Sequence, residues 1–154
     1  MTSAVDAATI TRQTSASPGQ VWSVLADGWA YTTWVVGACR VRAVEPDWPQ
    51  VGQRIHHSFG TWPVLLNDTT EVLEATELKS LTLQARGWPV GEATVHLTLQ
   101  PWQSGTLIGI REDAVSGPGT LIPKPLRQLA IGPRNRESLR RLAYLAEGRP
   151  GEPT

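Results

Sequence analysis

Three side chains in the middle of the sequence could take part in acid–base chemistry: His57, Asp68 and Glu112. Each lies in a segment where polar and apolar residues alternate, and successive residues of a β-strand point to opposite faces of a sheet. His57 shares its face with Ile55 and Phe59, so it should point toward an apolar interior. If the two carboxyl groups converge there, burial would raise their pKa values, and one could serve a carbonyl-bearing ligand as an acid or a base.

Each of these residues also has a purely structural interpretation. A single buried imidazole is often bonded to a neighbouring carboxylate or carbonyl group. A carboxylate on a strand often forms an ion pair at the sheet edge, and the candidate partners are Arg54, Arg86 and Arg111. The sequence is therefore compatible with a catalytic and with a structural role for these three residues.

The adjacent residues His56 and His57 make a poor metal site, because they would point to opposite faces of a strand. Cys39 is the single cysteine, which excludes an internal disulfide and a four-thiolate metal site and fits a reducing cytoplasm. The sequence contains no GxSxG motif, no P-loop and no GxGxxG motif after a strand. We therefore expect no metal ion and no cofactor.

The composition favours one cytoplasmic domain. A chain of 154 residues with 40% hydrophobic residues can bury a core without metal or disulfide support. Fourteen basic residues balance fourteen acidic ones, so neither nucleic acid nor a membrane surface is an expected partner. No apolar stretch approaches the roughly 18 residues of a membrane span. We expect one domain over residues 1–154, ordered from about 5 to 148 with a tail at 149–154, as a monomer or homodimer.

The segment from Pro125 to Glu147 predicts an amphipathic helix, because its apolar residues recur at helical spacing. Gly132-Pro133 leaves open whether this is one helix or two pieces. Its apolar stripe needs a partner, which the strand-rich middle of the chain can provide. The stripe comprises Leu126, Leu129, Ala130, Leu139, Leu142, Ala143 and Ala146.

The region before the strands predicts a first strand within Val5–Ser15 and then two short helices. The first helix is predicted to begin at Ser17-Pro18. Ser17 can cap the helix, Pro18 suits its first position, and Gln20 can complete a capping box. The second covers the sequence WAYTTW. Its Tyr31 and Trp34 could bond to and stack on a flat ligand at the lip of a cavity, or they could fill space between the helices and the sheet.

About six further strands follow in hairpin succession, which predicts an antiparallel sheet with one face in water and the C-terminal helix on the other. They are 39–45, 54–60, 66–75, 81–86, 92–100 and 106–112; the inward face of 66–75 is ambiguous. A curved sheet around a long helix leaves space for a small molecule. The predicted lining is Tyr31, Trp34, His57, Phe59, Ile110, Leu126 and Leu129.

The order of elements and several motifs resemble the SRPBCC superfamily, which has the START-like, birch-pollen-allergen-like helix-grip fold. The motifs are SPxxVWxVLAD, HHSFGTWP, ARGWPVGEATV, REDAVSGPG and RNRESLRRLAYLAE. They are similar to the bacterial polyketide cyclase/dehydrase-type branch over about residues 5–148. The resemblance implies an α+β fold in which a curved antiparallel sheet of about seven strands wraps around a long C-terminal helix, with two short helices after the first strand.

The first functional hypothesis is a module that binds a small hydrophobic molecule, such as a polyketide, a lipid or an aromatic metabolite. The second, implied by the resemblance, is a polyketide cyclase or dehydratase in which His57 moves protons with Asp68 or Glu112. The third is a protein-binding regulatory module that uses exposed tryptophans. An enzyme predicts two titratable side chains in contact inside the cavity, a carrier predicts an apolar lining with one or two polar anchors, and a partner module predicts a filled interior.

Overall fold

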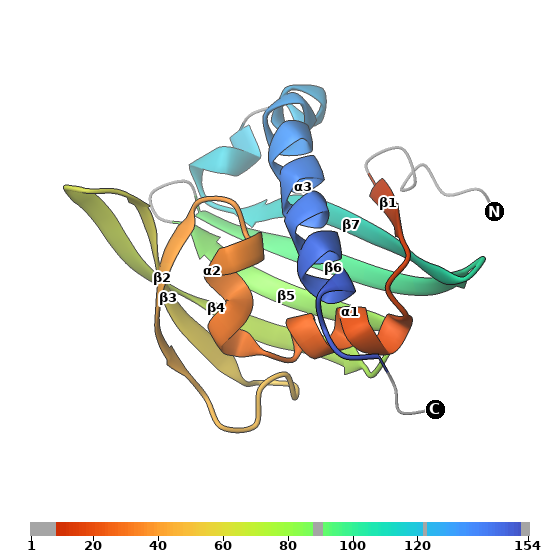
Figure 1. Ribbon diagram of the computed structural model, residues 1–154. Helices are drawn as coiled ribbons and strands as arrows, with labels where there is room; N and C mark the ends of the chain where they lie inside the picture. Colours follow the sequence, from red (N-terminus) through yellow and green to blue (C-terminus); the bar gives the residue numbers. More distant parts are fainter. Residues whose placement is uncertain (1–8, 88–90, 122, 152–154) are drawn as a thin grey trace.

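Seven strands pair in one antiparallel sheet in the computed structural model, which describes residues 9–87, 91–121 and 123–151 (Figure 1). The strands are β1 (Ile10–Thr14), β2 (Ala38–Val44), β3 (Arg54–Thr61), β4 (Val64–Thr76), β5 (Ser80–Gly87), β6 (Gly91–Trp102) and β7 (Gly105–Ser116). Their order across the sheet is β1-β7-β6-β5-β4-β3-β2, so neighbours along the chain from β2 to β7 are also neighbours in space. The predicted hairpin succession is confirmed. The predicted strand start at Val5 and the centre of the predicted turn at 88–90 lie outside the described residues.

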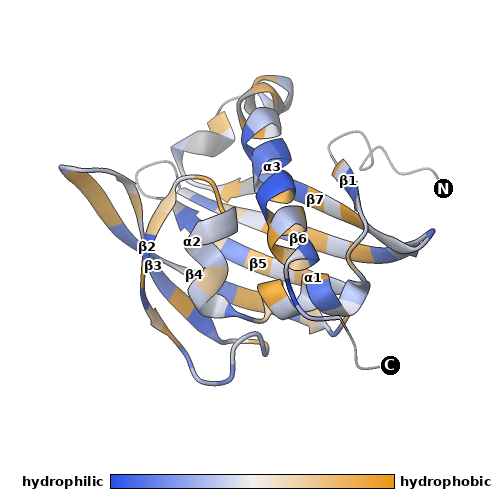
Figure 2. Cartoon of the chain, in the orientation of Figure 1, coloured by the Kyte–Doolittle hydropathy of each residue, from blue (hydrophilic) through white to orange (hydrophobic). Residues whose placement is uncertain are grey.

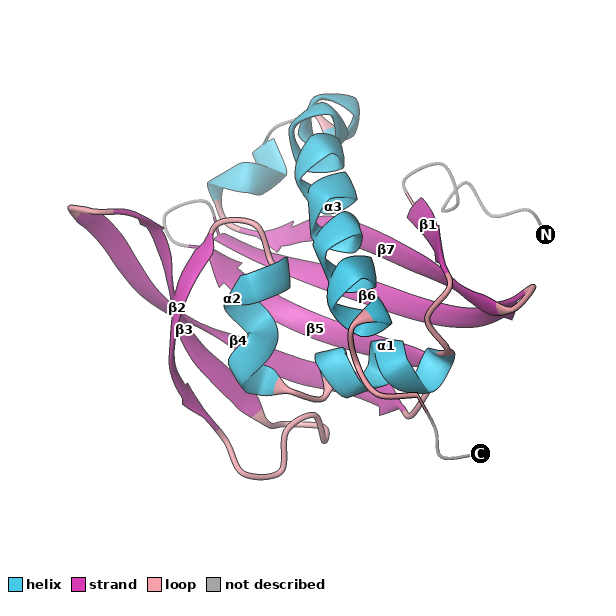
Figure 3. Cartoon of the chain, viewed as in Figure 1, coloured by secondary structure: helices cyan, strands magenta, loops and turns pink. Residues whose placement is uncertain are grey.

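The helices lie on one face of this sheet (Figures 1 and 3). They are α1 (Pro18–Leu25), η2 (Gly28–Ala30), α2 (Tyr31–Trp34), η3 (Pro118–Leu121) and α3 (Lys124–Glu147). The α+β helix-grip arrangement predicted from the sequence is therefore present. Within the described residues, no helix combines the length and the apolar character needed to cross a membrane.

Helix α1 begins as its sequence predicts. The Ser17 hydroxyl accepts a hydrogen bond from the Gln20 backbone N–H at 3.2 Å, and the Gln20 side chain accepts one from the Ser17 backbone N–H at 2.8 Å. This reciprocal capping satisfies two N–H groups that a helix start leaves without partners. It also fixes where the chain turns from β1 onto the face of the sheet.

Helix α3 runs through Pro133 as a single element. Proline has no N–H, so the carbonyl of Leu129 loses its helical hydrogen bond there. After this point the apolar stripe is buried, and its members Leu139, Leu142, Ala143 and Ala146 are at most 1% exposed. Before it, Leu126 is 57% and Leu129 is 73% exposed. The prediction that the whole stripe packs on the sheet is thus correct for the second half of α3 and wrong for Leu126 and Leu129, because contact with the sheet does not extend to them; the side chain of Ala130 lies outside the described part of the structure.

The concave face of the sheet is filled at one end, where the second half of α3 lies. Strand register aligns Leu81, Leu97 and Ile110 in one row, and each is at most 3% exposed. Figure 2 shows the alternation of hydrophobic and hydrophilic residues along the strands that produces this apolar face. At the other end, the aligned residues Ala85 and Ala93 are only half-buried. Coverage of the concave face therefore decreases toward the β5–β6 hairpin.

Candidate functional site

A buried line of three polar side chains joins α2 to strands β3 and β4. The Nε2 atom of His57 lies 2.8 Å from the hydroxyl oxygen of Thr70, and that oxygen lies 3.0 Å from the Tyr31 hydroxyl. His57 and Thr70 are 0% exposed and Tyr31 is 5% exposed. Thr70 lies opposite Ile55 in the β3–β4 register, so it shares the concave face with His57. This register settles the face of β4 that the sequence leaves ambiguous.

Aromatic rings surround the imidazole of His57. The Tyr31 ring lies 5.1 Å from it between centroids, and the Phe59 ring meets it edge to face at 4.6 Å. Trp34 packs edge to face on Tyr31 at 5.7 Å. The predicted group Tyr31, Trp34, His57 and Phe59 is thus one contiguous cluster, and flat rings in this arrangement favour contact with another flat, apolar group.

Burial keeps both titratable members of the line uncharged at neutral pH. Desolvation lowers the pKa of His57 from 6.5 to about 4, although the nearby Asp68 carboxylate opposes the shift. Desolvation also raises the pKa of Tyr31 from 10.0 to about 12, and the Thr70 hydrogen bond opposes that shift. The neutral imidazole can therefore donate or accept a hydrogen bond without carrying charge.

One polar atom of this cluster has no hydrogen-bond partner in the described part of the chain. It is Nδ1 of His57, which is shielded from solvent. Buried polar groups in proteins are nearly always paired, so an unpaired ring nitrogen in the interior needs an explanation.

Asp68 and Glu112, the two predicted carboxylates, have different surroundings. Asp68 lies directly opposite His57 in the strand register, and its Oδ1 accepts a hydrogen bond from the Thr69 backbone N–H at 2.8 Å. Glu112, which is 8% exposed, accepts from Nη2 of Arg134 through both carboxylate oxygens at 2.5 Å. Both carboxylates act on the pKa of Tyr31. They therefore lie within electrostatic reach of the same hydroxyl.

The three arginines that the sequence offers as ion-pair partners for Asp68 and Glu112 form ion pairs with other carboxylates. Arg54, Arg86 and Arg111 pair instead with Glu71, Glu92 and Asp113 respectively. The partner of Glu112 is Arg134 from α3, a residue that the sequence pattern assigns to the solvated face of the helix.

The other predicted lining residues are divided between core and surface. Ile110 is 3% exposed and belongs to the filled end of the interior. Leu126 and Leu129 lie on the exposed first half of α3. Ile110 thus belongs to the same apolar core as Tyr31 and Trp34, and Phe59 packs against that core.

Residues around His57 on the concave face are half-buried rather than buried. They are Phe59 and Asp68 on β3 and β4, and Ala85, Ala93 and Val95 on β5 and β6. The register relates them to one another across the four strands. A partly accessible apolar surface thus surrounds the buried polar line, at the end of the sheet that the second half of α3 leaves uncovered.

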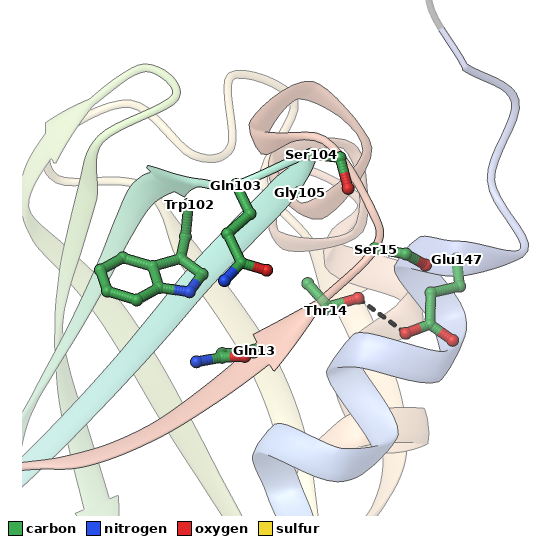
Figure 4. A pocket seen from close by; sticks show the side chains of 8 residues that line it. All are labelled: Gln13, Thr14, Ser15, Trp102, Gln103, Ser104, Gly105 and Glu147. Carbon is green, nitrogen blue, oxygen red and sulfur yellow. Dashed lines mark hydrogen bonds between the residues drawn. The ribbon is translucent and has the colours of Figure 1, made fainter.

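A hollow that is open to solvent, with a volume of about 410 Å³, lies at the β1 edge of the sheet (Figure 4). The end of β1, the β6–β7 turn and Glu147 at the end of α3 line it. The Thr14 hydroxyl donates to Oε1 of Glu147 at 2.7 Å there, and most of the lining is polar. Its chemistry does not suit an apolar ligand.

Among the described residues, no three His, Cys, Asp or Glu side chains come close enough to hold a metal ion. The single cysteine, Cys39, is exposed, and its thiol lies 3.3 Å from the Ser58 carbonyl oxygen.

Comparison with solved structures assigns the architecture. CV1439 from Chromobacterium violaceum superposes with a TM-score of 0.70 at 21% identity, over 92% of this chain and 97% of that chain. The di-domain ARO/CYC StfQ from the steffimycin biosynthetic pathway also gives 0.70, at 12% identity, over 90% of this chain and 49% of that chain. The chain has the helix-grip fold.

Other helix-grip neighbours include NE0264 from Nitrosomonas europaea, with a TM-score of 0.69 at 18% identity, over 90% of this chain and 92% of that chain. No protein-family model matches the sequence, and no curated protein sequence matches it. At these identities the likeness extends to the fold alone, so the site has to be interpreted from its own residues.

Two residues of the site, Thr70 and Arg134, are not among the site residues predicted from the sequence. Thr70 alternates with Asp68 and Val72 on β4, and this spacing would identify it once the inward face of the strand is known. Arg134 carries no such signal, because the helical pattern places it among charged surface residues. Only the packing of α3 on the sheet brings it to Glu112.

Proposed function

We propose that this helix-grip domain binds a small hydrophobic molecule on the concave face of its sheet, beside His57. The ligand lies against Phe59, Ala93 and Val95 and meets the polar line of His57, Thr70 and Tyr31 at one end. This arrangement matches an apolar lining with one polar anchor, which is typical of small-molecule sites.

The observation that supports this most strongly is the contrast between the two ends of the concave face. Leucine and isoleucine side chains fill one end completely, whereas alanine and valine side chains at the other end remain partly accessible around a buried histidine. Burying such a surface under a ligand gains about 25 cal/mol for each Å² of apolar area removed from water.

The test compares two variants of neighbouring residues on β6. Ala93→Leu adds volume to the concave face, whereas Thr94→Leu adds a similar side chain to the opposite face. We expect naphthalene, measured by NMR chemical-shift titration, to bind the wild type and Thr94→Leu alike and Ala93→Leu at least about tenfold more weakly. Equal binding to both variants, or no saturable binding to the wild type, would contradict the proposal.

A second candidate function is acid–base catalysis of the polyketide cyclase or dehydratase kind. The favouring observation is that a neutral imidazole and a neutral phenol are linked through one hydroxyl, which offers a route for a proton. Asp68 stands opposite His57, whereas Glu112 is engaged by Arg134. Incubation with a poly-β-ketone thioester would yield a dehydrated, cyclised product with the wild type, and His57→Leu would abolish this product while naphthalene binding persists.

A further inference from the structure

We infer that the ligand of this site is an uncharged molecule with a hydrogen-bond acceptor, such as a carbonyl oxygen, and that Nδ1–H of His57 donates to it. This inference rests on the proposed function and adds the chemical class of the ligand and the atom that recognises it.

The hydrogen bonds of the buried line have one direction that uses every hydroxyl proton. If the Tyr31 hydroxyl donates to Thr70, the Thr70 hydroxyl is free to donate to Nε2 of His57. Nε2 is then an acceptor, and the neutral ring carries its proton on Nδ1.

The opposite direction leaves more groups unpaired. If Nε2–H donates to Thr70, and Thr70 donates to Tyr31, the Tyr31 hydroxyl proton has no acceptor within the described residues, and Nδ1 keeps an unused lone pair. Because each buried unpaired group costs free energy, the first direction is favoured.

The favoured direction makes Nδ1–H a donor without an acceptor. His57 is 0% exposed, and no described side chain or carbonyl group pairs with this nitrogen. An acceptor on a bound ligand would complete the line from Tyr31 to the ligand, and an apolar ligand would leave the donor unpaired.

The burial of the ring disfavours an anionic acceptor, because a charged group would lose its hydration there. Asp68 stands opposite His57, and Glu112 lies close enough to affect Tyr31. The guanidinium of Arg134 already bonds to both oxygens of Glu112. Arg42 also acts on His57 and bonds to the Asp68 carbonyl oxygen, so two guanidinium groups balance the two carboxylates. A carboxylate on the ligand would have to give up its hydration beside a buried neutral donor, whereas a ketone, aldehyde or ester oxygen loses far less.

The test uses two probes of the same shape. In 2-acetylnaphthalene a carbonyl oxygen occupies the position that a CH₂ group occupies in 2-isopropenylnaphthalene. We expect the wild type to bind the ketone more tightly than the alkene, and the ratio of the two dissociation constants to fall about tenfold in His57→Leu. His56→Leu, a change in the adjacent residue on the opposite face of β3, is the matched control and should keep the wild-type ratio.

A second measurement needs no variant and therefore does not depend on the folding of His57→Leu. Imidazole ¹⁵N signals of the free wild type should show the proton on Nδ1. The ketone should shift the Nδ1 signal of His57 strongly, and the alkene should shift it little.

The outcomes separate this inference from the proposed function. If both probes bind with equal affinity to the wild type and His57→Leu does not change the ratio, the inference fails and the proposed function stands. If neither probe binds, the proposed function fails and the inference fails with it. Tighter binding of 2-naphthoate than of the ketone, or a proton on Nε2 in the ¹⁵N spectrum, would also overturn the inference.

Discussion

At the scale of single residues, the site depends on a histidine that is held neutral by its surroundings. Strand alternation places His57 inward, and the aromatic rings of Tyr31 and Phe59 exclude water from it. The same burial that makes the imidazole a neutral hydrogen-bonding group also makes its protonation unfavourable in the folded state.

The first prediction concerns stability at acidic pH. The pKa of His57 is about 4 in the folded protein against an ordinary value of 6.5, so between these values the unfolded chain binds the proton more readily. The stabilisation is complete above pH 6.5 and is lost as the pH falls toward 4. Between pH 7 and pH 4, the unfolding free energy of the wild type should therefore fall by about 3 kcal/mol more than that of His57→Gln, as measured by urea denaturation. Parallel losses in the two proteins would show that His57 is not buried as described.

The second prediction concerns the middle of the polar line. Thr70→Val keeps the shape of the side chain but leaves both the Tyr31 hydroxyl and Nε2 of His57 without a partner. We expect a loss of about 2 kcal/mol in unfolding free energy. Thr69→Val, the neighbouring change on the opposite face of β4, should cost well under half as much, and an equal cost would argue against the buried line.

At the scale of elements, α3 has two halves with different attachments. The second half packs its apolar stripe against α1 and the sheet. Each large side chain buried there contributes about 2 kcal/mol to the stability of the fold. The first half exposes Leu126 and Leu129 and is tied to β7 through the pair of Arg134 and Glu112. This pair therefore attaches the first half of the helix to the sheet.

The third prediction tests this attachment by amide hydrogen exchange. Arg134→Met should raise exchange rates in the first half of α3 about fivefold, because loss of the ion pair lowers the cost of local opening there. Rates over residues 139–147 should stay unchanged. Arg140→Met is the control, since Arg140 pairs with Glu137 on the same helix and should not loosen α3 from the sheet. Equal effects of the two variants would contradict the account.

At the scale of the whole molecule, the sequence predicts the architecture well and the site only in part. Period-two patterns and turn residues locate the strands from β2 to β7 within a few residues, and the register confirms that Phe59 and Glu112 face inward with His57. The partners of these residues depend on strand register and helix packing, which a linear pattern does not contain. The hydrogen bond of Thr70 and the ion pair of Arg134 therefore emerge only from the fold.

The same limit explains the exposed leucines. Helical periodicity identifies the apolar stripe of α3 but does not indicate how far along the helix the sheet makes contact. Leu126 and Leu129 follow the same periodicity as Leu139 and Leu142 and yet are exposed. Their role as ligand contacts remains a prediction.

The measurement that tests the central claim most directly is a set of intermolecular NOEs between naphthalene and the isotopically labelled protein. Binding on the uncovered concave face predicts contacts from naphthalene protons to Phe59, Val95 and Tyr31. Contacts confined to exposed apolar side chains such as Trp62, Leu126 and Leu129, with none to the residues around His57, would contradict the claim.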